Sequence, residues 1–346
     1  MIRLEQDFPL LPYNTFGIAA RAARFVEYGT VDDLRQVVRM LRDDFPGLPV
    51  LHIGGGSNLL FLSDFDGVVL HSAIGGVECR VSGHEALLRV GAAVVWDDFV
   101  ARCVEQGFHG VENLSLIPGE VGAAAVQNIG AYGVEAKDVI EAVETVDLQT
   151  GESRTFGVEE CGYAYRDSVF KGRLRGRYAV THVCFRLSRQ FVPRLDYGGL
   201  REALRAEGIR PEDATARDLR RVVTTIRQAK LPDPKVQGNA GSFFKNPVVD
   251  RAVYDRLKAD FPAMPCYEVD ARRVKVPAGW LIEQCGWKGR PLGRAAVHDR
   301  QALVLVNRGG ATGREILELC EAVQADVRAR FGIELSPEVN IIGGKQ

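Results

Sequence analysis

The chain has 346 residues, of which 46% are apolar and 26% charged, and its formal net charge is −1. This length predicts two or three domains, and the composition is typical of a globular protein. The near-zero charge provides no basic field for nucleic acid or an anionic membrane, and no run of about 20 apolar residues predicts a membrane span. We therefore expect neither a nucleic-acid partner nor a membrane.

The cysteines and histidines show neither the pattern of a disulfide framework nor that of a metal site. Seven cysteines are scattered without a Cys-x-x-Cys pair, and the six histidines are equally dispersed. This pattern favours reduced thiols and argues against a disulfide framework or a zinc site, so we expect no metal. The first residues, MIRLEQDFPLLPYNTF, lack the basic start and long apolar run of a signal peptide. We expect a cytoplasmic protein.

The first part of the chain reads as an α/β unit. A short strand is predicted at Phe25–Tyr28, followed by a helix that Thr30 caps and that carries apolar residues at helical spacing. A buried strand at Val50–Ile53 then leads into the glycine turn Gly54–Asn58. This order of strand, helix, strand and glycine turn indicates α/β architecture.

The turn Gly54–Asn58, GGGSN, fails as a dinucleotide fingerprint, because the residues at Leu59–Leu62 predict a strand and not a helix. One interpretation is a nest of backbone N–H groups that holds an anion. The other is an ordinary strand-to-strand turn, for which glycine and asparagine are the usual residues. Taken alone, these five residues favour the ordinary turn.

The middle of the chain reads as mixed α+β, with more strand than a doubly wound sheet has. Val68–Val95 is rich in strand pattern, and Asp97–Val104 predicts a helix that Gly107 closes. Strands are then predicted at Val143–Leu148, Ser153–Phe156 and Tyr178–Leu187, the last of them half-buried.

The stretch Pro118–Gly133, PGEVGAAAVQNIGAYG, is too poor in bulky side chains to build a core. Its glycines and alanines let the backbone approach another group closely. A short helix over Glu120–Val126 would point free N–H groups out of its first turn, which suits a phosphate. We expect this stretch to lie against a large flat cofactor. A tight packing joint between two domains is the alternative that these residues leave open.

The last part of the chain is predicted to contain a loop, several helices and a strand. A loop at Pro193–Leu200 precedes a helix over Thr215–Lys230, and Leu231-Pro232-Asp233-Pro234 resembles a domain boundary. Further helices are predicted near Asp250–Phe261 and Pro277–Cys285, a strand at Ala302–Asn307, and a last helix from Thr312, where Glu315 completes a capping box.

Three polar clusters fall in loops or beside glycines, at Tyr163–Ser168, Gly238–Pro247 and Ser336–Val339. Ser242 lies between a glycine and an aromatic pair, outside any G-x-S-x-G elbow, so a hydrolytic role has weak support. A role as proton or hydrogen-bond donor stays open. Taken singly, such residues have ordinary interpretations, such as a surface ion pair, a solvated carboxylate, a helix-end cation or a loop aromatic.

Several motifs together resemble the UDP-N-acetylenolpyruvoylglucosamine reductase family. In order, they are Asn14-Thr15-Phe16, GGGSNLL, PGEVGAAAVQNIGAYG, YAYRDSVFK, LPDPKVQGNAGSFFKNP, PAGWLIEQCG and SPEV, and they span nearly the whole chain. The loop around Tyr197 and the chain length resemble the longer of the two forms of that family. One departure is Arg300-Gln301, where the family often has Lys-His, and it leaves the role of that pair open.

The resemblance implies an α+β fold. It consists of a two-part FAD-binding domain of the vanillyl-alcohol-oxidase / UDP-N-acetylmuramate dehydrogenase type and a smaller α+β substrate-binding domain. The implied bounds are residues 1–75 joined by 332–346, residues 76–231, and residues 232–331.

The implied activity is an FAD-dependent reduction in which NADPH supplies the hydride. The substrate is the enolpyruvyl group of UDP-N-acetylglucosamine enolpyruvate, and the product is the lactyl ether of UDP-N-acetylmuramate, a peptidoglycan precursor. Two alternatives are a different FAD-dependent dehydrogenase or oxidase acting on a hydroxy acid, and a non-catalytic protein that binds nucleotide sugars. We expect a monomer, although the residues do not reveal the oligomeric state.

The resemblance also assigns roles to residues. Arg166, Ser242 and Glu338 would be catalytic, and Tyr197, Lys230, Asn246 and Gln284 would bind the substrate. The residues that would hold FAD are Gly54, Gly55, Gly56, Ser57, Asn58, Pro118, Gly119, Glu120, Val121, Gly122, Ala123, Gln127, Asn128, Gly130, Ala131, Tyr132, Gly133 and Arg227. These residue types suit the chemistry, because arginine stabilises a developing carboxylate charge, a hydroxyl supplies a proton, and a glutamate orients a donor.

Overall fold

The computed structural model describes residues 1–343, and these residues form two compact units. Unit 1 contains Met1–Phe8, Ala22–Gly55 and Phe65–Ala229, and unit 2 contains Pro9–Arg21, Gly56–Asp64 and residues 230–343. The predicted division into three domains stays a prediction. Within residues 1–343, no helix has both the length and the apolar character needed to cross a bilayer.

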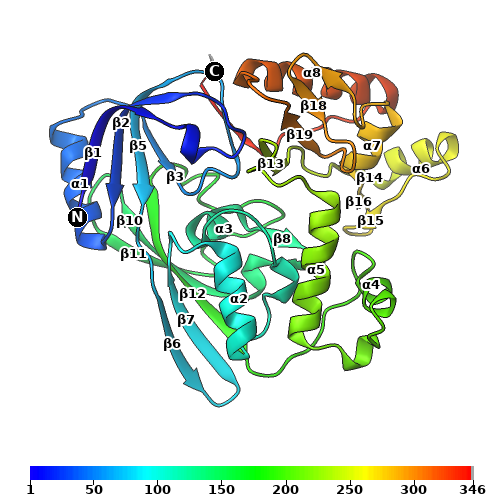
Figure 1. The fold of residues 1–346 in the computed structure, drawn as a ribbon, viewed down its shortest axis with the longest axis horizontal. Helices are drawn as coiled ribbons and strands as arrows, with labels where there is room; N and C mark the ends of the chain where they lie inside the picture. The colour runs from blue at the N-terminus through cyan, green and yellow to red at the C-terminus, as the bar shows by residue number, and fades with distance from the viewer. Residues whose placement is uncertain (344–346) are drawn as a thin grey trace. The chain divides into compact units, whose positions relative to one another are not determined.

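The first sheet of unit 1 is built around parallel strands (Figure 1). Its order is β1 (Arg3–Pro9), β2 (Arg21–Tyr28), β5 (Phe65–Ser72) and β3 (Val50–Ile53), and β5 runs parallel to both β2 and β3. Helix α1 (Val31–Asp43) begins where predicted, because the Thr30 hydroxyl accepts a hydrogen bond from the Asp33 N–H at 3.0 Å. Its buried face packs with the apolar residues of β2 and β5 in one cluster.

The second sheet of unit 1 is antiparallel throughout. Its order is β11 (Ser153–Gly157), β10 (Ile140–Asp147), β12 (Tyr178–Ser188), β7 (Glu85–Gly91) and β6 (Val77–Ser82). The predicted helix at Asp97–Val104 is α2 (Trp96–Gln106), closed by Gly107 in the left-handed conformation. Strand β12 is buried along most of its length, not half-buried as predicted, because Ala179 packs in one core cluster while Val180 and Val183 pack in another.

Unit 1 ends with two helices that share a small core. Helix α5 (Ala216–Lys230) matches its prediction, whereas α4 (Leu200–Ala206) lies beyond the predicted loop and was not predicted. Leu200, Leu204, Leu219, Val222 and Val223 pack together between the two helices. This contact stabilises a helix of only two turns, which is too short to be stable alone.

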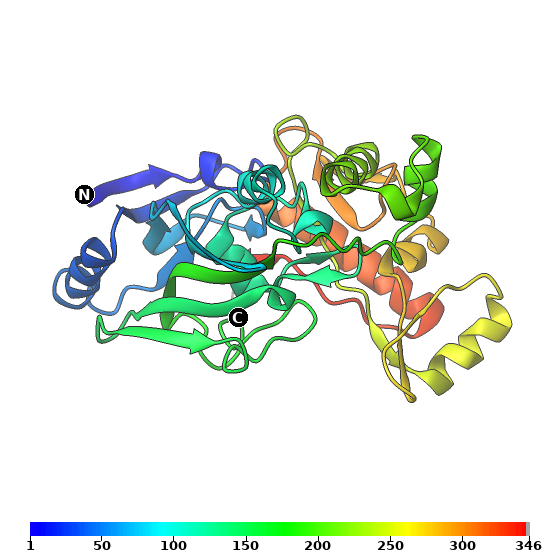
Figure 2. The same ribbon diagram turned by 90° about the horizontal axis from the view of Figure 1, so that it is seen from below.

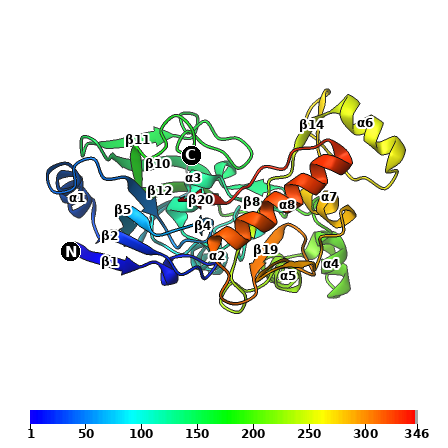
Figure 3. The same cartoon turned by 90° about the horizontal axis from the view of Figure 1, so that it is seen from above.

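Unit 2 holds two small antiparallel sheets and three helices. One sheet is β13 (Asn239–Ser242), β19 (Val304–Asn307), β18 (Ala295–Val297) and β17 (Pro291–Leu292), and the other is β14 (Val248–Asp250), β16 (Arg273–Lys275) and β15 (Tyr267–Glu268). Figure 2 shows α6 (Arg251–Asp260) as the yellow helix beside the second sheet. Helix α7 (Ala278–Gln284) and helix α8 (Gly313–Phe331) contact each other, and α8 also lies along β18 and β19 (Figure 3). The predicted capping box of Thr312 and Glu315 is confirmed.

The amino-terminal segment of unit 2 is held by hydrogen bonds to the residues that surround it. The Asn14 side chain bonds the backbone of Leu10 and Ile18 at 2.8–2.9 Å, and the Thr15 hydroxyl donates to the Asn239 carbonyl at 2.6 Å. The Thr15 N–H donates to the Gly56 carbonyl at 3.1 Å. Strand β4 (Leu59–Phe61) follows Gly56 in the chain and pairs in parallel with β20 (Asn340–Ile342).

Gly56→Ala is expected to destabilise the protein much more than Gly47→Ala does. Both glycines have positive φ, +68° and +76°, but a Cβ on Gly56 would overlap the Tyr13 carbonyl, whereas a Cβ on Gly47 would meet nothing within 4 Å. The control should cost about 1 kcal/mol from φ alone, and Gly56→Ala about 1–3 kcal/mol more from the overlap. Urea unfolding of the two variants measures the difference, and equal midpoints would contradict the close approach.

Candidate functional site

The glycine turn after β3 lies against a carboxylate. A Cβ on Gly54 would come within 2.8 Å of one Glu120 oxygen, and a Cβ on Gly55 would lie 3.5 Å from the other. Glu120 directly precedes helix α3 (Val121–Gln127), and its side chain makes no capping hydrogen bond to that helix. A side chain at position 54 would therefore displace the end of the Glu120 side chain, and glycine leaves room for it.

The start of α3 is joined to the end of β7 by backbone hydrogen bonds. The Val121 N–H donates to the Val94 carbonyl and the Gly122 N–H donates to the Ala92 carbonyl, both at 2.9 Å. A Cβ on Gly122 would lie 2.8 Å from the Ala92 methyl group. These contacts correct two expectations. The N–H groups of Val121 and Gly122 are already used by protein carbonyls, and the packing joint at Gly122 lies within unit 1, not between two domains.

The carboxyl end of α3 is bonded to the polar loop at Tyr163–Ser168. Asn128 is buried, and its amide donates to Glu135 at 3.0 Å and to the Ala164 carbonyl at 2.8 Å while accepting from the Lys137 N–H at 3.1 Å. The Ser168 hydroxyl donates to the Val126 carbonyl at 2.6 Å. The Asn128 side chain therefore holds the protein together and has little capacity left for a ligand.

Arg166 occupies a strained turn in that loop. Ala164 and Asp167 exchange two backbone hydrogen bonds of 3.1 Å, and Arg166 between them has φ +55°, where glycine or asparagine is usual. One guanidinium nitrogen donates to the Gly130 carbonyl at 2.5 Å. The Lys171 ammonium donates to the Arg166 carbonyl at 3.1 Å and to the Gln127 side chain at 2.5 Å. Strain of this kind, held by its surroundings, is typical of functional sites.

A tight hairpin brings two predicted ligand-binding tyrosines together. Strands β8 (Gly130–Ala131) and β9 (Val134–Glu135) are joined by Tyr132 and Gly133, both with positive φ. A Cβ on Gly133 would lie 3.3 Å from the Cβ of Tyr197, and a Cβ on Gly198 would lie 2.7 Å from the ring of Tyr132. The hairpin tip thus packs directly on the tyrosine loop.

Asn113 bonds both of these segments. It is buried, and its amide nitrogen donates to the Tyr132 carbonyl at 3.0 Å and to the Arg194 carbonyl at 2.9 Å. One side chain therefore uses both of its donor hydrogens to hold the hairpin and the tyrosine loop in register.

Arg227 places a second guanidinium near that of Arg166. Its Nε donates to the Leu116 carbonyl at 3.3 Å, and no carboxylate within residues 1–343 lies in ion-pair distance of it. Burial lowers the pKa of Arg227, the charge of Arg166 acts in the same direction, and Tyr132 and Asp97 oppose the shift. A half-buried cation without an ion-pair partner suits an anionic ligand.

Asp97 holds the backbone of Leu116, the residue whose carbonyl accepts from Arg227. It accepts from the Leu116 N–H at 2.5 Å and holds Arg220 through two bonds of 2.7 Å and 3.0 Å. Burial raises the pKa of Asp97, but the bonds from Arg220 and Leu116 outweigh burial and leave the pKa below its ordinary value. Leu116 has φ +59°, so this network holds a strained residue whose carbonyl accepts from Arg227.

Unit 2 brings Ser242 and Glu338 onto neighbouring backbone segments. The Glu338 N–H donates to the Phe243 carbonyl at 2.7 Å, and the Lys245 N–H donates to the Ser336 carbonyl at 2.9 Å. The Asn58 side chain donates to the Glu338 carbonyl at 3.2 Å. Within this unit, one end of the glycine turn, the predicted proton donor and the predicted carboxylate are therefore joined.

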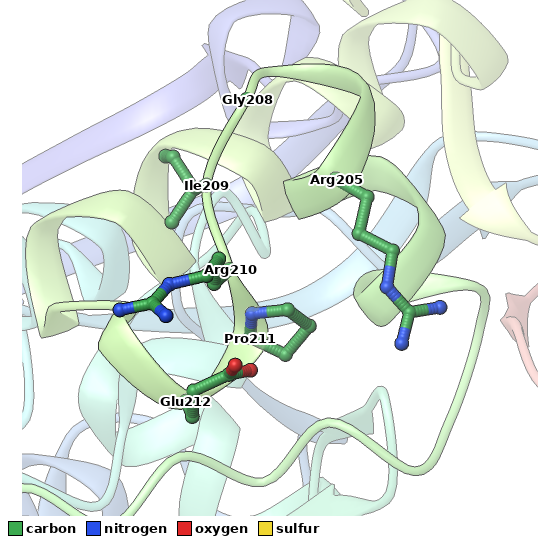
Figure 4. A pocket seen from close by; sticks show the side chains of 6 residues that line it. All are labelled: Arg205, Gly208, Ile209, Arg210, Pro211 and Glu212. Atoms are coloured by element: carbon green, nitrogen blue, oxygen red, sulfur yellow. The ribbon is translucent and has the colours of Figure 1, made fainter.

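The predicted substrate-binding residues are more dispersed. Asn246 accepts from the Ala278 N–H at 2.9 Å and so holds the start of α7, whereas Gln284 is exposed at the other end of that helix. Lys230 is the exposed last residue of α5, and the Tyr197 side chain is partly exposed. An open hollow beside α4 and the 3₁₀ turn η4 (Pro211–Asp213) contains no predicted site residue (Figure 4).

Three positioning residues were missed at the level of sequence. Asp97 resembled an ordinary acidic residue in a first helical turn, and Asn113 lay outside every motif. Lys171 ends the motif YAYRDSVFK, which was the one available signal, but the motif did not assign it a role.

Asn113→Asp is expected to destabilise the protein by about 1–3 kcal/mol, because it replaces both donors with acceptors that face two carbonyl oxygens. Arg194→Ala is the matched control, since it keeps the Arg194 carbonyl that Asn113 binds and should change stability by less than about 0.5 kcal/mol. Thermal unfolding compares the variants. If Asn113→Asp unfolds at the wild-type temperature, the two bonds do not hold the loops.

The comparisons with known proteins first define a class. Residues 22–157 match the family model "FAD binding domain", which places the chain among the FAD-binding flavoproteins. Residues 233–342 match "UDP-N-acetylenolpyruvoylglucosamine reductase, C-terminal domain". A UDP-N-acetylenolpyruvoylglucosamine reductase of Bacteroides fragilis is 56% identical over 98% of this chain and 100% of its own length. One of Burkholderia orbicola is 51% identical over 97% of this chain and 96% of its own length.

The chain therefore belongs to the UDP-N-acetylenolpyruvoylglucosamine reductase family, and it is an FAD-dependent oxidoreductase with NADPH as hydride donor. The crystal structure of the reductase from Thermus caldophilus has a TM-score of 0.69 at 24% identity and covers 99% of this chain and 100% of its own, which supports the fold. The predicted α+β fold with an FAD-binding domain is confirmed.

Proposed function

We propose that this protein uses NADPH and FAD to reduce the enolpyruvyl group of UDP-N-acetylglucosamine enolpyruvate to the lactyl ether of UDP-N-acetylmuramate. Family membership along almost the whole chain supports the reaction. The observation that carries the chemistry is the pairing of the segments that hold Ser242 and Glu338, through the bond from the Glu338 N–H to the Phe243 carbonyl. This backbone pairing supports the proposal that a hydroxyl and a carboxyl group act together.

The residues present fit FAD. Arg227 is a half-buried cation without a carboxylate in ion-pair distance among residues 1–343, and the hairpin tip, Tyr132 and Gly133, lies against the loop that carries Tyr197. We propose that Gly54–Asn58 and Pro118–Ala123 surround the diphosphate, although the N–H groups of Val121 and Gly122 bond protein carbonyls. We propose that Arg227 and Gln127–Gly133, apart from the Asn128 amide, hold the flavin. Bound at these residues, FAD would supply the hydride-transfer chemistry between NADPH and the enolpyruvyl double bond. The protein's own part is to position both partners and to exclude competing reactions.

Arg166 is proposed to stabilise the charge that develops during reduction. Hydride addition to the double bond drives negative charge towards the conjugated carboxylate, and a guanidinium meets a carboxylate with two parallel donors. The turn at Ala164–Asp167 fixes the backbone of Arg166, and the Gly130 carbonyl and the Lys171 ammonium hold its two ends. A donor that is fixed in advance pays little reorganisation cost as the charge appears.

Ser242 is proposed to deliver the proton that completes the reaction. The carbon left electron-rich by hydride addition is strongly basic, so a hydroxyl can protonate it. Glu338 is proposed to orient the donor or to hydrogen-bond the substrate carboxylate. The net result is one hydride and one proton added across the double bond, while NADPH becomes NADP⁺.

Tyr197, Lys230, Asn246 and Gln284 are proposed to bind the uridine diphosphate sugar. The packing of Tyr197 against the Tyr132–Gly133 hairpin supports a place for it beside the cofactor. The scattered cysteines support a cytoplasmic location, and we propose that the protein works there as a monomer.

The test is an assay of NADPH oxidation with UDP-N-acetylglucosamine enolpyruvate as the only acceptor. The purified protein is expected to be yellow from bound flavin, to consume NADPH only when this substrate is present, and to form UDP-N-acetylmuramate. A yellow protein that reduces or oxidises only a hydroxy or keto acid would support the alternative flavin enzyme. A colourless protein that FAD cannot reconstitute would overturn both.

Ser242→Ala is expected to keep reduction of the bound flavin by NADPH and to lose reoxidation by the enolpyruvyl substrate by at least about a hundredfold, the low end for general acid catalysis. Stopped-flow absorbance separates the two half-reactions. The matched control is Ser336→Ala, which removes an exposed hydroxyl from the segment that also carries Glu338 and should leave both rates unchanged. Wild-type reoxidation by Ser242→Ala would exclude Ser242 as the acid.

A further inference from the structure

His71 lies between two carboxylates next to the glycine turn. It is on β5, where it pairs in register with Glu27 of β2 and with Ile53, the residue before Gly54. Its Nδ1 lies 2.9 Å from a Glu27 oxygen, and its Nε2 lies 3.9 Å from a Glu120 oxygen. All three side chains are largely shielded, with exposed fractions of 13% for His71, 26% for Glu27 and 13% for Glu120.

The charged and titratable groups around His71 come from four elements. Glu27 lies on β2, Glu120 precedes α3, His52 lies on β3, and Arg3 of β1 approaches Glu27 at 3.9 Å. Without a proton on His71, two carboxylates face each other across a neutral ring, and Arg3 offsets the charge of Glu27. With the proton, His71 carries a positive charge between them.

The surroundings of the two histidines favour opposite charge states. Burial lowers the pKa of His71, but Glu120 and then Glu27 outweigh burial and hold it above its ordinary value of 6.5. The His52 ring shares one hydrogen bond of 2.8 Å with the Tyr28 hydroxyl. Burial, together with the charge of His71, lowers the pKa of His52 to about 4. His71 is therefore the group of this pair that titrates near neutral pH.

Glu120 creates an electrostatic conflict at the proposed cofactor site. Its carboxylate lies against Gly54 and Gly55, the residues proposed to hold the two negative charges of the FAD diphosphate. A carboxylate beside a bound diphosphate opposes binding unless a cation offsets it. His71 is the cation that the structure places next to Glu120.

We propose that His71 is a positioning residue for FAD: its imidazolium offsets Glu120 behind the glycine turn, so that the diphosphate binds to the form of the protein in which His71 is protonated. This inference rests on the proposed function, because it assigns the turn to the FAD diphosphate. It adds a residue that the family motifs do not name and makes cofactor retention depend on proton concentration.

The sign of the dependence follows from linkage. Binding an anion near His71 raises its pKa further, so FAD binding takes up a proton wherever the free protein has lost it. FAD affinity is therefore full below the pKa that His71 has in the FAD-free protein. It falls as pH rises from that value to the pKa of the FAD complex. Since the first value already lies above 6.5, the loss occurs at pH values above 6.5.

The experiment follows FAD release from the diluted holoenzyme by flavin fluorescence between about pH 6 and about pH 9, the range in which a perturbed histidine titrates. The wild-type dissociation constant is expected to rise at least about tenfold, which corresponds to a shift of about one pKa unit in His71. Glu120→Gln should bind FAD at least as tightly as wild type at every pH and should show little pH dependence. His71→Gln should bind about tenfold more weakly at the acidic end and should also show little pH dependence. His84→Gln, which changes an exposed histidine, should behave as wild type.

Each outcome of this experiment either supports or overturns the role proposed for His71. A wild-type affinity that does not change with pH, or a Glu120→Gln variant that binds FAD more weakly than wild type, would overturn it while leaving the reductase activity intact. Absence of FAD binding at any pH would overturn the proposed function and this inference together. If His71→Gln does not fold, Glu120→Gln still provides the test. The histidine NMR titration of the wild type adds a second readout, since the pKa of His71 must rise on FAD binding.

Discussion

The candidate site depends on backbone segments that approach one another more closely than any side chain would permit. Gly56 against the Tyr13 carbonyl and Gly122 against Ala92 are two such contacts, and each excludes a Cβ, while Gly130 lies against the Arg166 guanidinium. Such close contacts suit a binding site, because a hydrogen-bonded backbone is rigid and presents its remaining polar groups in fixed directions. Side chains such as Asn113 and Asn128 then fill the remaining hydrogen-bonding positions between these segments.

Several charged side chains of unit 1 lie close together at the proposed cofactor site. Unit 1 carries two half-buried guanidiniums, Arg166 and Arg227, whose mutual repulsion a bound anion would offset. Asp97 does not neutralise Arg227 directly, since it is engaged with Arg220. Without a bound anion, the repulsion between the two guanidiniums raises the free energy of the folded protein, and a bound anion lowers it. The same physical situation with opposite sign occurs at Glu120, where the carboxylate needs His71. Binding of an anionic cofactor therefore relieves the repulsion between the two guanidiniums, whereas at Glu120 the anion adds negative charge that the His71 imidazolium must offset.

Most of the regular elements could be predicted because their signals are local. Thr30, Gly107 and the Thr312–Glu315 box mark helix ends by hydrogen bonds to neighbouring residues, and the structure shows those bonds. Helix α4 and strand pair β8–β9 could not be predicted, because their stability comes from distant partners. The same limit applies to the site. Asn128 resembled a cofactor ligand, yet its amide is used by Glu135 and Ala164, and Asp97 pairs with Arg220, 123 positions away.

The proposed chemistry sets two opposing requirements on these residues. Strong stabilisation of the substrate carboxylate by Arg166 eases hydride addition, but it also draws charge away from the carbon that must next be protonated. A hydroxyl is a weak acid, so Ser242 can act only while that carbon stays strongly basic. A fixed, single guanidinium that retains a bond to the Gly130 carbonyl stabilises the charge without neutralising it completely. A serine acid and a restrained arginine are therefore matched to each other, and a stronger cation at position 166 would require a stronger acid at position 242.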